Sequence, residues 1–309
     1  MATTAFSNSG AISSYSLPPQ IPNLNFYPTN PRFNWSSKSP SSGRSAIIRR
    51  LRRYCSPVPN PSCSLDLPLL PFELDEVLIP SEFKTLHLYE ARFLALLEES
   101  LQRRKKLFVH FVLDPFFTSR SSAGASFAAR YGCLVLIESI KQLEIGALVS
   151  IRGIGRVRIV ELMQMEPYLR GVILPILDDV SGQKSEIDSK LLELRKSIHN
   201  LHSLQIKLKV ASKNELLQTR IKNSLAWAER EVYEDCDQAF IPNLAERLSF
   251  AALQTVSGMS DSELLALQSE KLRAMDSRDT VERLRNGIKF TKQNINMVAA
   301  KLAIQSLGI

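Results

Sequence analysis

The hydrophobic positions between Leu67 and about Asp179 come in short apolar runs that are separated by glycines. Apolar runs of this kind, rich in Val, Ile and Phe and bounded by Gly, are typical of β-strands. We therefore predict strands over 107–113, 133–140, 147–160 and 169–177. The segment from Tyr89 to Leu101 has the helical period instead, with Phe93, Leu96, Leu97 and Leu101 on one face. Many short strands and one early helix predict a small β-domain that is closed or nearly closed.

Prolines divide the segment LPLLPFELDEVLIPSEFKTLHLYEARFLALLEES, which runs from Leu67 to Ser100. Proline cannot donate a hydrogen bond to a strand ladder, and it is found at strand starts, edges and bends. Pro68, Pro71 and Pro80 therefore predict a short strand, a bend and a second short strand ahead of the helix. Further boundaries are expected at the glycines of the strand-rich part, which are Gly132, Gly146, Gly153, Gly155 and Gly171.

After residue 183 the apolar residues follow the helical period up to the C-terminus. The first helix has an apolar stripe made of Leu191, Leu194, Ile198, Leu201 and Leu208. Capping boxes at Ser212–Glu215 and Ser260–Glu263 predict the starts of the second and fourth helices. We expect the third helix to begin at Ile241-Pro242-Asn243, to end at Gly258, and to face inward through Leu244, Leu248, Ala252 and Val256.

The last helix carries a heptad-like seam made of Val281, Leu284, Ile288, Thr291, Ile295, Val298 and Leu302. Such a seam packs either inside one chain or against a second copy. We favour a bundle within one chain, while an oligomer formed through this C-terminal helix stays open. The predicted fold class is therefore α+β: a small β-barrel with one early helix, followed by an all-α bundle or hairpin with a long C-terminal helix.

Residues 1–63 differ from the rest of the chain in composition. No Asp or Glu precedes Asp66, Ser and Pro are frequent, and the basic residues are Arg32, Lys38, Arg44, Arg49, Arg50, Arg52 and Arg53. An acid-free, Ser-rich and basic leader is typical of an organelle transit peptide, and an ordinary disordered tail is the alternative. Because the first charge comes only at Arg32, we favour a plastid address over a mitochondrial one. We expect cleavage of the transit peptide between about Tyr54 and Ser64 and a mature protein in the chloroplast stroma. The mature protein would have a β-barrel half over 64–180 and a helical half over 184–309.

The leader also accounts for most of the positive charge. The whole chain has 39 Lys and Arg against 31 Asp and Glu, a net charge of +8, and without the leader the balance is 32 against 31. A nearly neutral domain lacks the electrostatic footprint of a nucleic-acid binder. Local basic groups remain at Arg103–Lys106, which we assign to a helix end, and at Arg152, Arg156 and Arg158. No run of about 18 apolar residues occurs, so no membrane span is expected.

Candidate metal, cofactor and catalytic residues are sparse. No CxxC pair occurs, and Cys133 and Cys236 do not pair with histidines at ligand spacing. His199 and His202 share one helix face but have no acidic or thiol partner nearby, so we assign them to a solvated face. None of the 12 glycines lies in a GxxxxGK[ST] loop, and in RGIGRVRI the position of a third dinucleotide-loop glycine is held by Arg158.

The order and spacing of these motifs resemble the amino-terminal substrate-binding domain of Lon proteases. The opening segment is similar to the family's LPLFPL start, second proline, LHI-like strand and E-x-R-[FY] helix entry, at Leu67, Pro68, Leu69, Pro71, Pro80, Leu86, Leu88, Glu90, Arg92 and Phe93. The similarity continues through Tyr131-Gly132, Gly146, RGIGRVRIV, Glu166-Pro167-Tyr168, LAERLSFAAL and SELLALQSEKLRAMDSRDTVERL to about Phe290. It implies a PUA-like β-barrel. Two departures are Ser81, where the family usually has Gly, and a long loop over 114–130 that we interpret as an insertion.

The resemblance implies a recognition module of a stand-alone plant plastid type and not an enzyme. The ATPase and Ser-Lys peptidase modules of a full Lon protease have no counterpart in these 309 residues, so we expect no catalysis, no cofactor and no metal. Expected partners are unfolded or client proteins of the stroma, or a plastid protease, with neither nucleic acid nor a membrane. The alternatives are an RNA-binding PUA-like module, or a subunit named by homology as an ATP-dependent peptidase.

The loop over 114–130 is the expected client-binding site, because aromatic side chains among small polar residues supply apolar contact to an unfolded segment. Its aromatic residues are Phe116, Phe117 and Phe127. The alternative is that these rings pack into the barrel's own core, since exposed aromatic residues reduce solubility. Phe83, Leu86 and Leu88 are weaker candidates, because strand alternation hides part of that set.

Overall fold

The computed structural model describes residues 64–116, 126–178, 184–211, 218–230 and 236–307. The strand-rich part contains β1 (Leu65–Phe72), the short 3-10 helix η2 (Leu74–Glu76), β2 (Phe83–Leu88), α2 (Ala91–Arg103), β3 (Leu107–Phe116), β4 (Ser126–Gln142), β5 (Ala147–Gln164) and β6 (Leu169–Pro175). The predicted strands and the early helix are confirmed. The predicted transit peptide over residues 1–63 lies outside the described residues.

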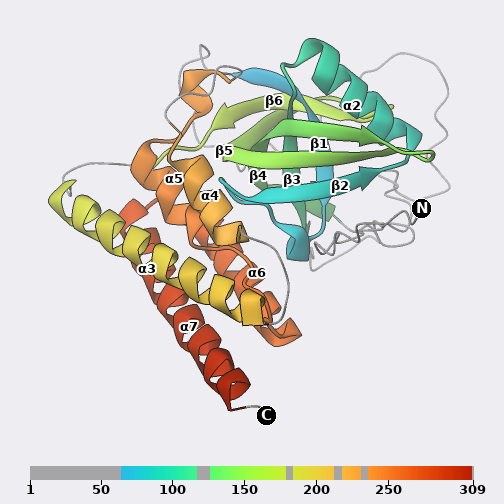
Figure 1. The fold of residues 1–309 in the computed structure, drawn as a ribbon. Coiled ribbons are helices and arrows are strands. Elements are labelled where there is room, and N and C mark those ends of the chain that lie inside the picture. Colours follow the sequence, from blue (N-terminus) through green and yellow to red (C-terminus); the bar gives the residue numbers. More distant parts are fainter. Residues whose placement is uncertain (1–63, 117–125, 179–183, 212–217, 231–235, 308–309) are drawn as a thin grey trace, which may run out of the picture.

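Five strands close into a ring (Figure 1). β4 pairs with β3 and β5, β3 runs parallel to β1, and β1 is antiparallel to β6, which pairs back with the second half of β5. The parallel pair β1–β3 requires a crossover, and the crossover here consists of η2, β2 and α2. β2 pairs antiparallel with the first half of β5 and has no second partner strand in the described part of the chain. The prediction of a small closed β-domain is confirmed.

The prolines of β1 lie inside the strand and not at its bends, which corrects the sequence-based expectation. Pro68 lies where β1 pairs with β6, opposite Arg170, and Pro71 lies where β1 pairs with β3, opposite Phe111. The two pairings overlap only at Leu69, so each proline has one side of the strand without a ladder. Proline is tolerated at such positions, because a nitrogen that faces the side without a ladder needs no acceptor.

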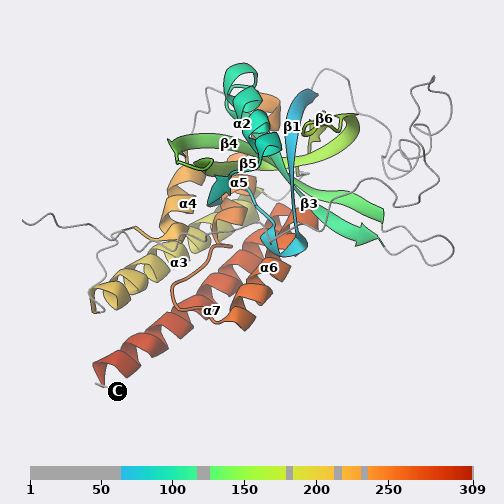
Figure 2. The same ribbon diagram turned by 90° about the vertical axis from the view of Figure 1, so that its right-hand side faces the viewer.

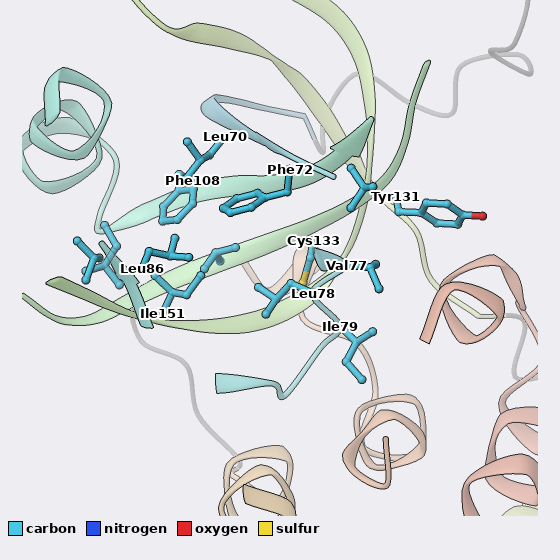
Figure 3. Close-up of a cluster of buried hydrophobic side chains, with 14 of the residues drawn as sticks. Leu70, Phe72, Val77, Leu78, Ile79, Leu86, Phe108, Tyr131, Cys133 and Ile151 are labelled. Carbon is cyan, nitrogen blue, oxygen red and sulfur yellow. The ribbon is translucent and has the colours of Figure 1, made fainter. Parts of the chain in front are cut away.

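Alternation along the strands sends apolar side chains into two cores in the strand-rich part. All five ring strands contribute to the first core, which includes Leu69, Val109, Leu134, Val157 and Ile173. The second core lies on the other face of the strands and is covered by α2 and by the helical part (Figure 3). Its members include Leu70, Phe72, Phe108, Cys133 and Ile151, together with Phe93 of α2 and Phe250, Leu267 and Met275 of the helical part.

Four glycines expected at strand boundaries lie inside strands, which corrects that expectation: Gly132 in β4, Gly153 and Gly155 in β5, and Gly171 in β6. At the two positions in β5 another backbone comes close. A Cβ atom at Gly153 would lie 2.3 Å from the carbonyl oxygen of Ile79, and one at Gly155 would lie 2.7 Å from that of Phe240. Gly146, with a φ of 80°, does lie in the turn between β4 and β5. The spacing of glycines therefore marks close packing as well as turns.

The helical part contains α3 (Lys184–Ala211), α4 (Arg220–Ala228), η3 (Gln238–Phe240), α5 (Leu244–Ala251), α6 (Asp261–Asp276) and α7 (Thr280–Ser306). Figures 1 and 2 show α3 and α7 projecting side by side away from the ring. Ion pairs join Glu186 to Arg285 and Glu193 to Lys292, with the same separation of 99 residues, so the two helices run parallel. None of the described helices has the length and apolar character needed to cross a bilayer.

The predicted helix ends are partly right. Ser260 and Glu263 form the predicted capping box of α6, and Asn243 caps α5. The box predicted at Ser212 lies outside the described residues, and α4 is capped by Thr219. α5 ends at Ala251, well before Gly258, and its first residue Leu244 is 41% exposed, so the expectation that Leu244 faces inward is wrong. The α7 seam packs against the stripe of α3 within the chain, as predicted.

A buried ionic cluster joins the strand-rich and helical parts. We call it the junction cluster: Arg156 of β5, Asp178 after β6, Glu246 of α5 and Arg283 of α7. Each of the four side chains is at most 2% exposed. Arg156 donates to both carboxylates, at 2.8 Å to Glu246, and Arg283 donates to Asp178. Two cations and two anions thus balance each other in the interior, where an unpaired charge would be costly.

Candidate protein-binding surface

The segment predicted as a binding loop over 114–130 is partly a β-hairpin. β3 and β4 pair through Asp114 with Ala128, Pro115 with Phe127 and Phe116 with Ser126. Phe117 lies outside the described residues, and so do the side chains of Phe116 and Phe127. The segment is therefore not one long loop, because strand pairing takes up both of its ends. Whether these rings bind a client stays a prediction.

The three weaker candidates divide between the core and the surface. Leu86 and Leu88 are each 3% exposed and belong to the second core, where Figure 3 shows Leu86 among the packed side chains. They are therefore corrected to core residues, because alternation along β2 points them inward. Phe83, on the opposite face of β2, is 37% exposed.

The outward face of β2 forms an aromatic surface. We call it the β2 stripe: Phe83, Thr85, His87 and Tyr89, which follow one another at the two-residue spacing of one strand face. Tyr89 is 39% exposed, and its ring centroid lies 5.5 Å from that of His87. The stripe therefore runs along β2 towards the start of α2, with Thr85 and His87 half-buried between two exposed aromatic rings.

Arg152 of β5 holds the beginning of the β2 stripe in place. Its guanidinium lies 5.0 Å from the ring centroid of Phe83, a cation–π distance, and is 4% exposed beneath it. The same guanidinium donates to Glu138 at 2.9 Å, to the carbonyl oxygen of Ser81 at 3.2 Å and to Asn223 of α4 at 3.2 Å. All of these contacts fix one arginine rotamer, so Phe83 rests on a rigid support.

The turn between β4 and β5 continues the stripe at its other end. His87 Nε2 lies 3.0 Å from the carbonyl oxygen of Ile145, so this nitrogen donates the hydrogen bond. The Ile145 side chain is 73% exposed, and Ile140 on the adjoining strand is 37% exposed. The sequence pattern did not mark His87, Tyr89 or Ile145 as surface residues of a site, and it placed Arg152 in a local basic group. The alternation that hides Leu86 and Leu88 is the signal that identifies His87 as outward-facing.

Two of the three arginines of β5 are not accessible to phosphate. Arg152 and Arg156 are both buried and paired with carboxylates, which corrects their interpretation as a local basic spot. Arg103 ends α2, as predicted, and Lys105 and Lys106 follow it with φ values of 51° and 64°. The internal position of two of the arginines weakens the RNA-binding alternative, since phosphate contacts require accessible cations.

The two helical histidines contact neighbouring side chains. His202 Nδ1 lies 3.1 Å from Thr219 Oγ1, and His199 Nδ1 lies 3.4 Å from Lys222 Nζ. Within the ranges that the structure describes, no group of three or more His, Cys, Asp or Glu side chains is placed to hold a metal ion.

Comparisons with known proteins identify the family. The family model described as the "ATP-dependent protease La (LON) substrate-binding domain" matches residues 66–293. Among curated protein sequences, none matches this chain. Solved structures that match include the N-terminal domain of Mycobacterium avium complex Lon protease, at 13% identity over 74% of this chain and 98% of that one, with a TM-score of 0.40. They also include a Lon N-terminal domain protein from Xanthomonas campestris, at 19% identity over 72% of this chain and 96% of that one, with a TM-score of 0.34. Because the family model matches well over half of the sequence, this chain belongs to the Lon substrate-binding domain family.

Proposed function

We propose that this chain is a non-catalytic recognition module that binds exposed apolar segments of client proteins, or of a protease that receives such clients. The family is described as a substrate-binding domain, and its model matches both the strand-rich and the helical parts. The observation that carries the proposal is the β2 stripe with Ile145 beside it. These apolar side chains lie outside both cores, on a rigid sheet, where a partner can cover them.

The chloroplast stroma is the proposed location, and its support is the composition of residues 1–63. An acid-free, Ser-rich and basic leader precedes the family match, which begins at residue 66. Clients would then be stromal proteins with exposed apolar segments, and the partner protease would be a plastid one.

Capture of an unfolded protein tests the proposed function. The full chain is immobilised and exposed to a reduced, alkylated and therefore permanently unfolded model protein, with the same protein in its native form as the control. We expect capture of the unfolded form alone. Failure to capture the unfolded form, or equal capture of both forms, contradicts the proposal.

A matched pair of variants locates the capture. Tyr89→Ser combined with Ile145→Ser removes apolar surface from the proposed site, where the two side chains are 39% and 73% exposed. Leu192→Ser is the control, because Leu192 is a 53% exposed leucine on α3. We expect the double variant to weaken capture by about tenfold with an unchanged melting temperature, since a few buried apolar anchors dominate most interfaces. Equal capture by the control and the double variant excludes this surface.

A further inference from the structure

The outer edge of β2 carries backbone groups without a strand partner. The N–H of Gly153 donates to the carbonyl oxygen of Glu82 at 3.0 Å, and this bond sets the alternation along the antiparallel β2–β5 pair. Lys84, Leu86 and Leu88 therefore exchange hydrogen bonds with β5. The N–H and C=O groups of Phe83, Thr85 and His87 point to the other side, where no strand of the described chain pairs with them.

β2 lacks two of the devices by which proteins commonly protect an exposed edge. Such strands often carry proline, a β-bulge or an inward-pointing charge that an added strand would bury. The sequence of β2, FKTLHL, contains no proline, and its ladder with β5 has no register shift. Its charged residue, Lys84, points to the inner face, where its ammonium lies 3.2 Å from Glu76 and 4.9 Å from the ring centroid of Phe72. Lys84 is such an inward-pointing charge, but it is already paired with Glu76 and its side chain is 12% exposed, so a strand added at the free edge would bury no unpaired charge here. The free edge is therefore available for pairing with another extended chain.

The same residues that present the free backbone groups also present the stripe side chains. A strand added beside β2 would place alternate side chains next to Phe83, Thr85 and His87, at the cross-strand distance at which aromatic and β-branched residues attract each other. Two of the charges near this edge are paired within the chain, Arg152 with Glu138 at 2.9 Å and Lys84 with Glu76. An uncharged apolar segment therefore complements the edge better than an acidic or a basic one.

We propose that the edge of β2 binds an extended, uncharged segment of a client protein by strand addition. This inference rests on the proposed function and specifies how the client is held. The backbone groups of Phe83, Thr85 and His87 bond the client chain whatever its sequence, and the β2 stripe selects β-branched and aromatic side chains at alternate positions. An extended polypeptide is the occupant because it alone repeats donors and acceptors at the spacing of a strand edge.

Backbone methylation of a peptide tests the strand addition on the unaltered protein. The probe is a fluorescein-labelled decapeptide of alternating Val and Thr, made in an unmodified form and in a form that is N-methylated at every position. The methylated form lacks the donors of both strand edges and keeps all its side chains. We expect the full chain to bind the unmodified form and to bind the methylated form at least about tenfold more weakly, measured by fluorescence anisotropy. Equal binding of the two forms overturns the inference.

A proline variant tests the protein side of the contact. Thr85→Pro removes an N–H that faces the free edge and leaves the bonds to β5 intact, so the fold is expected to persist. Thr85→Val keeps the backbone donor and is the matched control. We expect Thr85→Pro to lose about tenfold in affinity for the peptide and Thr85→Val to bind like the wild type. Full affinity in Thr85→Pro overturns the inference, and if that variant does not fold, the methylated peptide decides.

The outcomes separate this inference from the proposed function. If the wild-type chain captures neither the unfolded protein nor the peptides, the proposed function fails. If it captures them and Thr85→Pro does so equally well, the strand addition alone fails. A second copy of this chain is the other possible occupant of the edge, and analytical sedimentation of the wild type and of Thr85→Pro tests for such a dimer. A dimer that Thr85→Pro dissociates without loss of peptide binding overturns the client assignment.

Discussion

Replacing Asp178 by Asn is expected to unbalance the junction cluster. The Asp178 carboxylate accepts hydrogen bonds from Arg156, from Thr280 and from both Nη atoms of Arg283, one of them at 3.3 Å. Its side chain is fully buried, and the two guanidinium groups are 1% and 2% exposed. The Asn variant keeps the volume of the side chain but leaves two buried cations with Glu246 as the one remaining anion of the cluster.

The expected loss in free energy of unfolding is about 3–5 kcal/mol, which is typical when one partner of a buried ion pair is removed. For a folded region of this size, such a loss lowers the melting temperature by roughly 6–20 °C. The cost arises from the uncompensated arginine charge and not from the loss of a contact as such. Removing Arg283 as well should therefore recover part of the stability, because Arg156 and Glu246 remain as a neutral pair.

Urea unfolding followed by circular dichroism measures these differences. Glu186→Gln is the control, because its ion pair with Arg285 lies on the surface, with side chains 36% and 56% exposed. A surface pair contributes at most about 1 kcal/mol. The reasoning is refuted if Asp178→Asn costs no more than the control, or if the double variant Asp178→Asn/Arg283→Met is less stable than Asp178→Asn alone.

Three further outcomes are expected. Burial raises the pKa of the Glu246 carboxyl above its ordinary value, so the stability that this group contributes is lost as the pH rises through its pKa in the folded protein. The urea midpoint of Glu246→Gln should therefore increase relative to that of the wild type as the pH rises through this pKa. A difference between the two midpoints that stays constant at all pH values would contradict this. Ser81 has a φ of 68°, a conformation that glycine adopts more easily than serine, and its hydroxyl shares a 2.6 Å hydrogen bond with that of Ser224. In a Ser224→Ala background, where this hydrogen bond is already absent, Ser81→Gly should raise the free energy of unfolding by about 1 kcal/mol. A lower free energy of unfolding would show that the turn does not strain this residue. A reporter fused to residues 1–64 should enter chloroplasts, and a fluorescent signal confined to the cytosol would exclude the plastid address.

The elements were predictable because their signals are local. Short apolar runs locate β3 to β6, and the pairing of Ser260 with Glu263 locates the start of α6. The exposure of Leu244 was not predictable in this way, because the apolar period does not say how the first turn of a short helix is oriented against the rest of the fold. Local pattern thus identifies elements, and their packing decides which side chains are covered.

The junction cluster and the β2 edge depend on residues far apart in sequence. Arg156 meets a partner 22 residues away and another 90 residues away, so no spacing rule connects them. In the sequence these arginines have the composition of a basic surface, and only the closed ring of strands shows that they are internal. The edge position of β2 likewise follows from the pairing of β6 with β5, since that pairing closes the ring without β2.

The beginning of β2 is held by both parts of the fold, which bears on how a client would be bound. Ser81 contacts Ser224 of α4, Glu82 pairs with Lys271 of α6, and Arg152 donates to Asn223 of α4. A strand added to β2 would therefore dock on an edge that is already fixed, and little conformational entropy of the protein would be lost on binding. The entropy cost would fall mainly on the client, so segments that are already unfolded and extended are favoured over folded ones. The helical part, in this view, supports recognition by holding the edge of the sheet rigid.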